Sequence, residues 1–411
     1  MKRVLILNYE LPPLGGGGGV AALTIAKGLL RKGYEVDYIT TRHKTLPSFE
    51  VLDGINVYRV KVLGRKGIQT ATPISLFSFP FAAIWQTFKL CRIYKYAFMH
   101  THFVVPTGPL GFIFSKLFKI KNYVFIHGGD IYDPTRANSC HRSNLFRKVI
   151  SFLLNRADAV VTQSQDMRDH CVRFYKPKTP IQIVPLPYIP RAFKSVDRAE
   201  LGLRDDKKYV IGVGRLIKRK DFVTFILALS RLDDSFEGII LGYGPEYKHL
   251  LQTAKAVGVE ERLHFIGQVS EEKKFQYLLN SDIFLLTSIH EGFGIVVQEA
   301  MQVGLPIIAT DCGGQRDLVE ENINGFLVKV GNVDGIVVKI RNLLTDQNIC
   351  KQISARNILK IKDFDLDIIC NRYLNLHTAV NTSEAPQTTT SVSPSREFAR
   401  ISSHNKGNKG D

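Results

Sequence analysis

The sequence predicts an α/β protein of two Rossmann-like domains, each with a parallel sheet. The 411 residues correspond to two or three domains at about 150 residues each. A strand, a glycine-rich loop and a helix follow one another at the start of the chain, and a similar succession begins again at Tyr209. Pro185, Pro187 and Pro190 lie between the two halves and mark a linker, so we expect the domain boundary near residues 186–196.

The first half opens with a strand at Arg3–Tyr9, the five glycines Gly15–Gly19, a helix at Val20–Arg31 and a second strand at Glu35–Thr40. Consecutive glycines do not form the spaced G-x-G-x-x-G motif of a dinucleotide site. The second strand also ends in Thr-Thr-Arg, without the acidic residue that binds a ribose. The loop lies where ligands of such folds bind, but the pattern disfavours a Rossmann oxidoreductase.

An uncharged aromatic stretch follows at Ile68–Phe88. Its prolines and polar residues disfavour a transmembrane helix. Two interpretations stay open. The aromatic side chains lie in a membrane interface, with Lys89, Arg92 and Lys95 beside lipid headgroups, or the stretch is an ordinary helix packed within the first domain.

The next strands lead to a polar motif at a sheet edge. A strand at Ala97–Phe103, a helix at Gly108–Lys119 and a strand at Asn122–Ile126 precede His127-Gly128-Gly129-Asp130. Ligands of open α/β sheets bind at the carboxyl ends of strands, so His127 and Asp130 are candidate site residues. The last strands of this domain are expected at Asp158–Thr162 and Ile181–Val184.

The second half opens with a strand and a cationic loop. Arg215 and Lys220 follow the strand Tyr209–Val213, and a helix begins at about Phe222. Two cations in one loop can converge on a diphosphate. The strand at Ile239–Leu241 again ends in a glycine turn, which includes Gly244.

A second glycine-rich segment, residues 288–327, organises the rest of the chain. It contains a turn, a helix that Gly304 closes, a buried strand at Ile307–Ala309 and a further turn at Gly313–Gly314. Such turns leave backbone N–H groups free at helix N-termini, where anionic or hydroxylated ligands bind. The residues proposed to face the ligand here are Glu291, Gly292, Phe293, Gly294, Ile295 and Glu299.

Glu291 and Glu299 are separated by seven residues, and both carboxylates can accept hydrogen bonds from the hydroxyls of a sugar or ribose. They stand within E-G-F-G-x4-E-A-M-x-x-G-x-P-I-I-A-T-x-x-G-G. This motif closely resembles the signature of glycosyltransferase family 4, which has the GT-B fold: two Rossmann-like domains with parallel sheets that face across a cleft. With other matches, the resemblance covers about residues 1–376.

The resemblance implies a retaining, metal-independent transfer of a sugar from a nucleotide-diphosphate donor. It implies that Arg215 and Lys220 bind the diphosphate, because the chain matches the pattern G-R-L-x-x-x-K there. It likewise implies that His127 contacts the donor sugar and that Asp130 serves the acceptor hydroxyl. Further matches are Gly16 and Gly17, in a P-P-x-x-G-G loop that lies against diphosphate and acceptor, and Gly244.

From these matches we expect an acceptor-binding domain at residues 1–186 and a nucleotide-sugar-binding domain at 187–362. Residues 363–377 are expected to form a helix that returns to the first domain. Residues 378–411 are rich in Ser, Thr, Asn, Pro and Lys, and a disordered tail is predicted there.

No metal or other cofactor is expected. His100 and His102 form an H-x-H pair without an evident third ligand, and the D-x-D of Asp365 and Asp367 falls at a helix start, where acids are favoured anyway. The six cysteines include no C-x-x-C pair and are expected to be reduced. With no secretory signal before the strand at Val4–Leu7, we expect a cytoplasmic protein, with peripheral contact at the inner face of the plasma membrane as a further expectation.

Charge is distributed unevenly along the chain. Residues 1–190 hold 26 Lys and Arg against 10 Asp and Glu, net +16, while residues 191–411 hold 29 against 28, net +1, which together give +17. A basic first half indicates an anionic partner such as an acidic membrane, a phosphorylated lipid or nucleic acid. We therefore expect a lipid-linked or membrane-associated glycan as acceptor, in the synthesis of a cell-surface polysaccharide or glycolipid.

Three alternatives stay open beside a hexosyltransferase. A GT-B phosphorylase would need pyridoxal phosphate and a lysine to hold it. A sugar-nucleotide epimerase would turn over the donor without an acceptor. A basic nucleic-acid-binding protein would show a steep salt dependence, but no nucleic-acid-binding motif is present, and no nucleic acid is expected as a partner.

Overall fold

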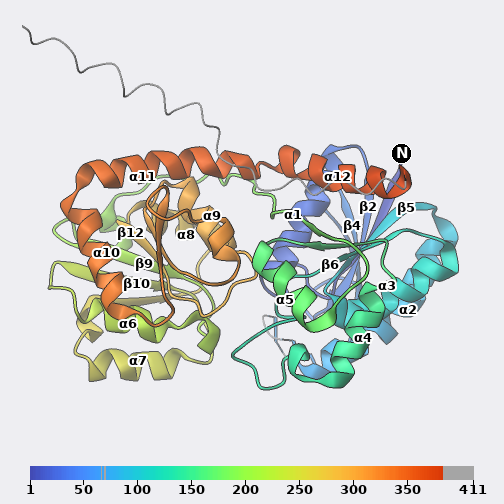
Figure 1. Cartoon of the computed structure of the whole chain (residues 1–411), viewed down its shortest axis with the longest axis horizontal. Coiled ribbons are helices and arrows are strands. Elements are labelled where there is room, and N and C mark those ends of the chain that lie inside the picture. The colour runs from blue at the N-terminus through green and yellow to red at the C-terminus, as the bar shows by residue number, and fades with distance from the viewer. Residues whose placement is uncertain (66, 69–70, 383–411) are drawn as a thin grey trace, which may run out of the picture. The chain divides into compact units, whose positions relative to one another are not determined.

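The computed structural model describes residues 1–65, 67–68 and 71–382, with side chains described up to residue 377. The chain divides into two units, Met1–Tyr373 and Leu374–Asp411, and the first contains both sheets. Figure 1 shows the two sheets of this first unit, each with helices packed around it. The predicted pair of parallel α/β sheets is thereby confirmed, whereas the predicted domain boundaries stay predictions. The predicted tail at 378–411 lies outside the described residues from 383 onward, and α12 extends to Thr382.

The first sheet has eight strands in the order β3-β4-β2-β1-β5-β6-β7-β8, all parallel except the β3–β4 pair. The strands are β1 (Arg3–Leu7), β2 (Glu35–Arg42), β3 (Phe49–Leu52), β4 (Ile55–Lys61), β5 (Tyr96–His102), β6 (Asn122–Phe125), β7 (Ala159–Thr162) and β8 (Ile181–Ile183). The helices are α1 (Gly17–Arg31), α2 (Pro73–Ile93), α3 (Val104–Phe118), α4 (Asn144–Leu154) and α5 (Gln165–Tyr175). Leu5 and Leu7 of β1 pack with α2 and α3, because alternate residues of a strand face one side of its sheet.

The second sheet has six parallel strands in the order β11-β10-β9-β12-β13-β14, the strand order of a Rossmann fold. The strands are β9 (Lys208–Val213), β10 (Phe236–Leu241), β11 (Leu263–Gly267), β12 (Ile283–Leu286), β13 (Ile307–Thr310) and β14 (Gly325–Val328). The helices are α6 (Phe222–Leu229), α7 (Tyr247–Ala256), α8 (Glu271–Leu279), α9 (Ile295–Gln302), α10 (Val333–Thr345) and α11 (Gln347–Lys360), and α12 (Leu366–Thr382) follows them. Central strands such as β12 are buried on both faces, as parallel strands between helices are.

Helix α1 begins earlier than the sequence predicted. The apolar spacing starts at Val20, but the helix includes Gly17, Gly18 and Gly19. A Cβ at Gly18 would collide with the ring of Phe103. The first turn of α1 therefore uses glycine for close packing, which a search for apolar periodicity does not detect.

The final helix starts three residues later than the predicted residue 363, after a short 3₁₀ turn. Asp365 accepts a hydrogen bond from the backbone N–H of Asp367 at 2.8 Å, as expected for acids at a helix start. Asp367 pairs with Lys32, the residue after α1, at 3.0 Å, and the ring of Tyr373 lies 5.7 Å from that of Phe125 in β6. Within Met1–Tyr373, the start of α12 thus contacts elements of the first sheet.

The aromatic stretch forms α2. Thr72 caps the N-terminus of this helix, because its side chain accepts a hydrogen bond from the N–H of Ser75 at 3.1 Å. Among the described residues, α2 is the one helix long and apolar enough to cross a membrane, with 33% of its most apolar window buried. One side of α2 packs on the first sheet through Phe79 and Ala83. Phe81 is 77% exposed on the other side.

Candidate active site

Both sheets have a point at which the strand order reverses, between β1 and β5 and between β9 and β12. Ligands of open α/β sheets bind beside such a point, at the carboxyl ends of the strands. The loop after β1 holds Gly16, the loop after β9 holds Arg215, and the loop after β12 holds Glu291. The folding topology therefore collects most of the predicted site residues at two equivalent sheet positions.

Arg215 follows β9 and is exposed. Within the described residues its guanidinium forms no ion pair. A Cβ on Gly16 would lie 3.8 Å from the Arg215 guanidinium, and a Cβ on Gly17 would lie 3.7 Å from the side chain of Ile295. The two glycines of the first sheet thus face two predicted donor-binding residues of the second.

Lys220 and Glu291 form a buried ion pair, in which the Lys220 ammonium donates to Oε1 of Glu291. Ser288 Oγ donates to the same oxygen at 2.6 Å. Burial raises the pKa of Glu291, but the positive charges of Lys220 and Arg219 and these hydrogen bonds outweigh it and lower the pKa to about 2. Glu291 is therefore ionised at neutral pH and acts as an acceptor.

Glu299 lies on α9 and is also buried. Its Oε1 accepts a hydrogen bond from the ammonium of Lys274 on α8 at 2.7 Å, while its Oε2 is buried and has no partner among the described residues. Burial raises the pKa of Glu299, and the Lys274 charge opposes that rise. A buried carboxylate oxygen without a donor is costly unless a ligand hydroxyl supplies one.

The turn before α9 exposes backbone rather than side chains. The ring of Phe293 is buried in the core and lies 6.0 Å from that of Phe364, so Phe293 offers only its backbone to a ligand. Gly294 has φ +114°, which favours glycine, and Ile295 begins α9. Within the described part of the chain, the N–H groups of Gly292, Phe293 and Gly294 donate to no acceptor.

Glu10, which belongs to none of the predicted motifs, fixes the glycine loop after β1 by hydrogen bonds. Oε2 of Glu10 accepts hydrogen bonds from the backbone N–H groups of Gly16 at 3.0 Å and Gly19 at 3.2 Å. The N–H of Gly16 is therefore already used in this structure. An acid before a glycine run is a weak signal, because only the fold brings the carboxylate back onto the loop.

His127 follows β6 and has protein partners on both ring nitrogens. Nε2 lies 2.8 Å from Nδ1 of His102, and Nδ1 lies 3.1 Å from the amide nitrogen of Gln163. Burial lowers the pKa of His127 to about 3, so the ring is neutral at pH 7. A contact between His127 and a donor sugar, as predicted, would require it to exchange one of these partners.

Asp130 is buried and hydrogen-bonded to backbone. Oδ2 accepts from the N–H of Val104 at the start of α3, at 3.0 Å, and Oδ1 accepts from the N–H of His127 at 3.1 Å. Burial raises its pKa to about 6, against the lowering effect of the backbone hydrogen bonds. These bonds give Asp130 a structural role, and its predicted role toward the acceptor hydroxyl stays a prediction.

Gly244 packs closely against the backbone of the cationic loop that carries Arg215. A Cβ at Gly244 would collide with the carbonyl of Leu216, next to Arg215. Glu246 donates its backbone N–H to the same carbonyl at 3.0 Å. Gly244 therefore shapes the loop that carries Arg215, which is an indirect contribution to a donor site.

Two family models match this chain in succession. The "Glycosyl transferase 4-like domain" matches residues 16–187, and "Glycosyl transferases group 1" matches residues 193–359. The chain belongs to the GT-B glycosyltransferases. The first matched region contains the glycines from Gly16 onward and His127. The second contains Arg215, Lys220, Glu291 and Glu299, the predicted cationic and acidic donor residues.

Known proteins similar to this glycosyltransferase include enzymes with varied acceptors. N-acetyl-alpha-D-glucosaminyl L-malate synthase of Bacillus anthracis is 25% identical over 364 residues, 84% of this chain and 88% of that protein. A Campylobacter jejuni N-acetylgalactosaminyltransferase acting on N-acetylgalactosamine-N,N'-diacetylbacillosaminyl-diphospho-undecaprenol is 23% identical over 376 residues, 89% of this chain and 96% of that protein.

Solved structures share the fold of this glycosyltransferase. Sucrose-phosphate synthase from Thermosynechococcus elongatus aligns with a TM-score of 0.82 and 20% identity, over 93% of this chain and 100% of that one. Anabaena HepE in complex with UDP and glucose aligns with a TM-score of 0.71 and 21% identity, over 92% and 100%. At these identities the alignments show the GT-B fold alone.

Proposed function

We propose that this glycosyltransferase moves a hexosyl group, with retention, from a nucleotide-diphosphate sugar to a hydroxyl of a lipid-linked or membrane-associated glycan. The product would belong to a cell-surface polysaccharide or glycolipid. The donor assignment rests mainly on Arg215, which is exposed next to Gly16 and has no ion-pair partner among the described residues. Lys220, at the end of the same loop, pairs with Glu291. An anionic ligand there could bind Arg215 directly and share Lys220 with Glu291.

The cationic loop would act on the leaving diphosphate. Negative charge grows on the diphosphate as the glycosidic bond breaks, and fixed cations stabilise that charge in the transition state. Arg215 offers a planar, bidentate group, while Lys220 offers a point charge that Glu291 already holds in place. These two cations take the place of a metal at the diphosphate, so we propose that magnesium does not raise donor affinity.

The acidic residues would recognise hydroxyl groups. Glu291 is ionised and can accept a hydrogen bond from the donor sugar, beside the N–H groups of Gly292 and Gly294, which have no acceptor among the described residues. Oε2 of Glu299, which has no partner in the described part of the chain, would accept from a ribose hydroxyl. Glu291 already pairs with Lys220, so we assign it no nucleophilic role.

An exposed apolar surface on α2 supports the membrane-associated acceptor. Ile74, Phe77, Phe81 and Trp85 of α2 follow one another at helical spacing and are all more than half exposed. Phe77 lies with its ring 6.4 Å from Phe146 of α4, so the two helices are neighbours in this surface.

Basic residues accompany this apolar surface. Arg92 lies over the ring of Phe88 at 5.9 Å, and Arg156 lies over Phe152 of α4 at 3.9 Å. Aromatic rings flanked by cations are typical of proteins that lie in the interface of an anionic membrane. The Campylobacter relative, whose name gives a diphospho-undecaprenol acceptor, supports a lipid-linked substrate.

A panel of nucleoside diphosphates tests the donor assignment. We expect UDP, GDP or ADP to raise the melting temperature of the protein, since a ligand that binds the native state stabilises it. The Glu299→Ala variant should respond less, and NAD should have no effect.

Failure of every nucleotide to stabilise the wild-type protein would contradict the donor assignment. Conversion of a sugar nucleotide without any acceptor would instead indicate an epimerase. If magnesium is required for nucleotide binding, the two cations do not replace a metal.

A further inference from the structure

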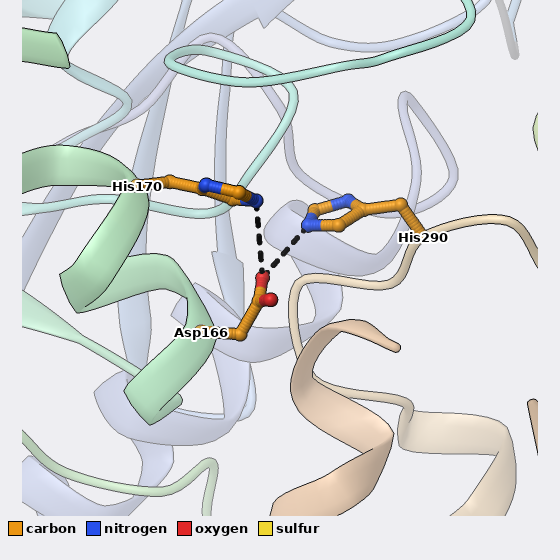
Figure 2. Close-up of side chains that lie close together, drawn as sticks. All are labelled: Asp166, His170 and His290. Atoms are coloured by element: carbon orange, nitrogen blue, oxygen red, sulfur yellow. Dashed lines mark hydrogen bonds and ion pairs between the residues drawn. The ribbon is translucent and has the colours of Figure 1, made fainter. Parts of the chain in front are cut away.

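Two histidines and an aspartate form a compact cluster beside the loop that leads to Glu291. Asp166 and His170 lie four residues apart on α5, and His290 directly precedes Glu291. Figure 2 shows both imidazoles directed at the Asp166 carboxylate. Nε2 of His290 lies 2.9 Å from Oδ2 of Asp166, and Nε2 of His170 lies 3.7 Å from the same oxygen.

The cluster is shielded from solvent. The side chain of His290 is 3% exposed, and those of Asp166 and His170 are each 19% exposed. The ring of Tyr132 covers the two imidazoles, with its centroid 3.7 Å from His170 and 4.9 Å from His290. The polar atoms therefore converge at a site that is largely shielded from solvent, with partial exposure at Asp166 and His170.

Hydrogen bonds outside the cluster fix the two segments that carry it, the start of α5 and the loop around His290. Ser164 Oγ, just before α5, donates to the carbonyl of Gly292 at 2.8 Å. The N–H of Gln165 donates to Oδ2 of Asp317 at 2.8 Å. The start of α5 and the loop around His290 are thus positioned without help from the histidines, so the three donor groups are arranged in advance.

We propose that Asp166, His170 and His290 bind a divalent transition-metal ion of the zinc type. Their candidate ligand atoms all lie within 4.8 Å of one another. Tetrahedral zinc with bonds of about 2.0–2.1 Å separates its ligand atoms by roughly 3.4 Å. The distances of 2.9 and 3.7 Å from the carboxylate fall on either side of that separation, and the two imidazole nitrogens lie at most 4.8 Å apart, so the side chains would have to shift to bind an ion.

The donor set selects the class of ion. Two imidazoles and one carboxylate suit zinc and related transition metals, whereas magnesium and calcium prefer oxygen ligands. Charges of both signs lie near the site: the carboxylate of Asp317 interacts electrostatically with that of Asp166, while Arg316 acts on Asp166 and Arg173 acts on His170. A water molecule would complete the coordination on the open side.

The ion would have a structural role as a cross-link. It would join α5 to the segment that carries Glu291, and so stiffen the turn before α9. The diphosphate would still be bound by Arg215 and Lys220, so this inference does not depend on the proposed donor chemistry.

Zinc titration by calorimetry tests the site. We expect the wild-type protein to bind one Zn²⁺ and to gain thermal stability from it, and Co²⁺ to give the visible absorption of a tetrahedral site. His170→Gln should lower the Zn²⁺ affinity by more than the roughly 10–100-fold that loss of a supporting residue costs a metal site. His249→Gln, at an exposed position on α7, is the matched control and should bind like wild type.

Three outcomes would overturn the inference: no Zn²⁺ binding by the wild type, equal affinity in His170→Gln, or an equal loss in His249→Gln. Equal affinity would assign the ion to other groups and leave the cluster as a hydrogen-bonded contact. If His170→Gln fails to fold, Asp166→Asn keeps the side-chain shape and takes its place, with the same affinity loss expected. Nucleotide binding, measured on the same samples, separates failure of this site from failure of the donor site.

Discussion

The buried pair of Lys220 and Glu291 should stabilise the fold as well as bind the donor. In the Lys220→Met variant, Glu291 would remain buried with Ser288 and the more distant charge of Arg219. Loss of one member of a buried ion pair leaves the other charge without compensation, which destabilises proteins strongly. We expect Lys220→Met to lower the stability of the protein at pH 7.

The size of the effect follows from the pKa of Glu291. Its fall from 4.5 to about 2 corresponds to about 3 kcal/mol at roughly 1.4 kcal/mol per unit. Lys220 and other groups lower this pKa while burial raises it, so we take the net shift, about 3 kcal/mol, for the removal of Lys220. For a domain of about 150–250 residues, that is a fall in melting temperature of roughly 6–12 °C.

The direction with pH follows from the same shift. The pKa of Glu291 is lower in the folded protein than in the unfolded chain, so the contribution is present above pH 4.5 and is lost as the pH falls toward about 2. The penalty of Lys220→Met is therefore measured at pH 7, and it should shrink in acid.

Thermal unfolding of a double-mutant cycle provides the assay. Adding Glu291→Gln to Lys220→Met removes the uncompensated charge and should recover part of the lost stability. Lys218→Met is the matched control, because Lys218 is exposed in the same loop and forms no ion pair among the described residues. A Lys220→Met protein as stable as Lys218→Met, or a cycle in which the two changes are simply additive, would refute the reasoning.

Three further predictions concern the ligand sites. Arg215→Ala should weaken nucleoside diphosphate binding by about 1.5–3 kcal/mol, measured by calorimetry, because a charged hydrogen bond is lost; Lys218→Ala is the control, and unchanged affinity would remove Arg215 from the donor site. Replacing Phe81 and Trp85 by Ser should release the protein from vesicles with anionic lipid in a flotation assay, and absence of vesicle binding by the wild type would end the membrane argument. Glu10→Gln should lower turnover, because a neutral amide holds the glycine loop less firmly; unchanged kinetics would leave Glu10 without a role in the site.

The sequence predicted the fold because both sheets follow a simple periodic pattern. Buried strands such as β12, glycine turns and the helix closed by Gly304 are local features, and the structure confirms them. The β3–β4 hairpin was missed, although Asp53-Gly54 at its turn has positive φ at both residues and is a known hairpin signal. The four residues of β3 have no buried position, but β4 alternates buried and partly exposed residues over seven positions, so its pattern was present in the sequence.

The site was predicted less completely, because its pairs join distant parts of the chain. Lys274 stands 25 residues before Glu299, and no local motif connects them. The bond between His127 and His102 spans 25 residues and is likewise invisible before folding. Motif matching proposes which residues face a ligand, whereas the partners that hold them depend on sheet order.

These pairings bear on how a donor would enter. Lys220 and Lys274 are each neutralised by a buried glutamate, while Arg215 has no such partner within the described residues. An incoming diphosphate would therefore meet Arg215 first, at the lowest cost in broken interactions. Lys220 would then be shared between the diphosphate and Glu291, and its positive charge would reduce the repulsion between these two anionic groups. A site built from pre-formed pairs rejects a lone anion more readily than one built from free cations, and it favours a ligand that carries both a diphosphate and hydroxyl groups.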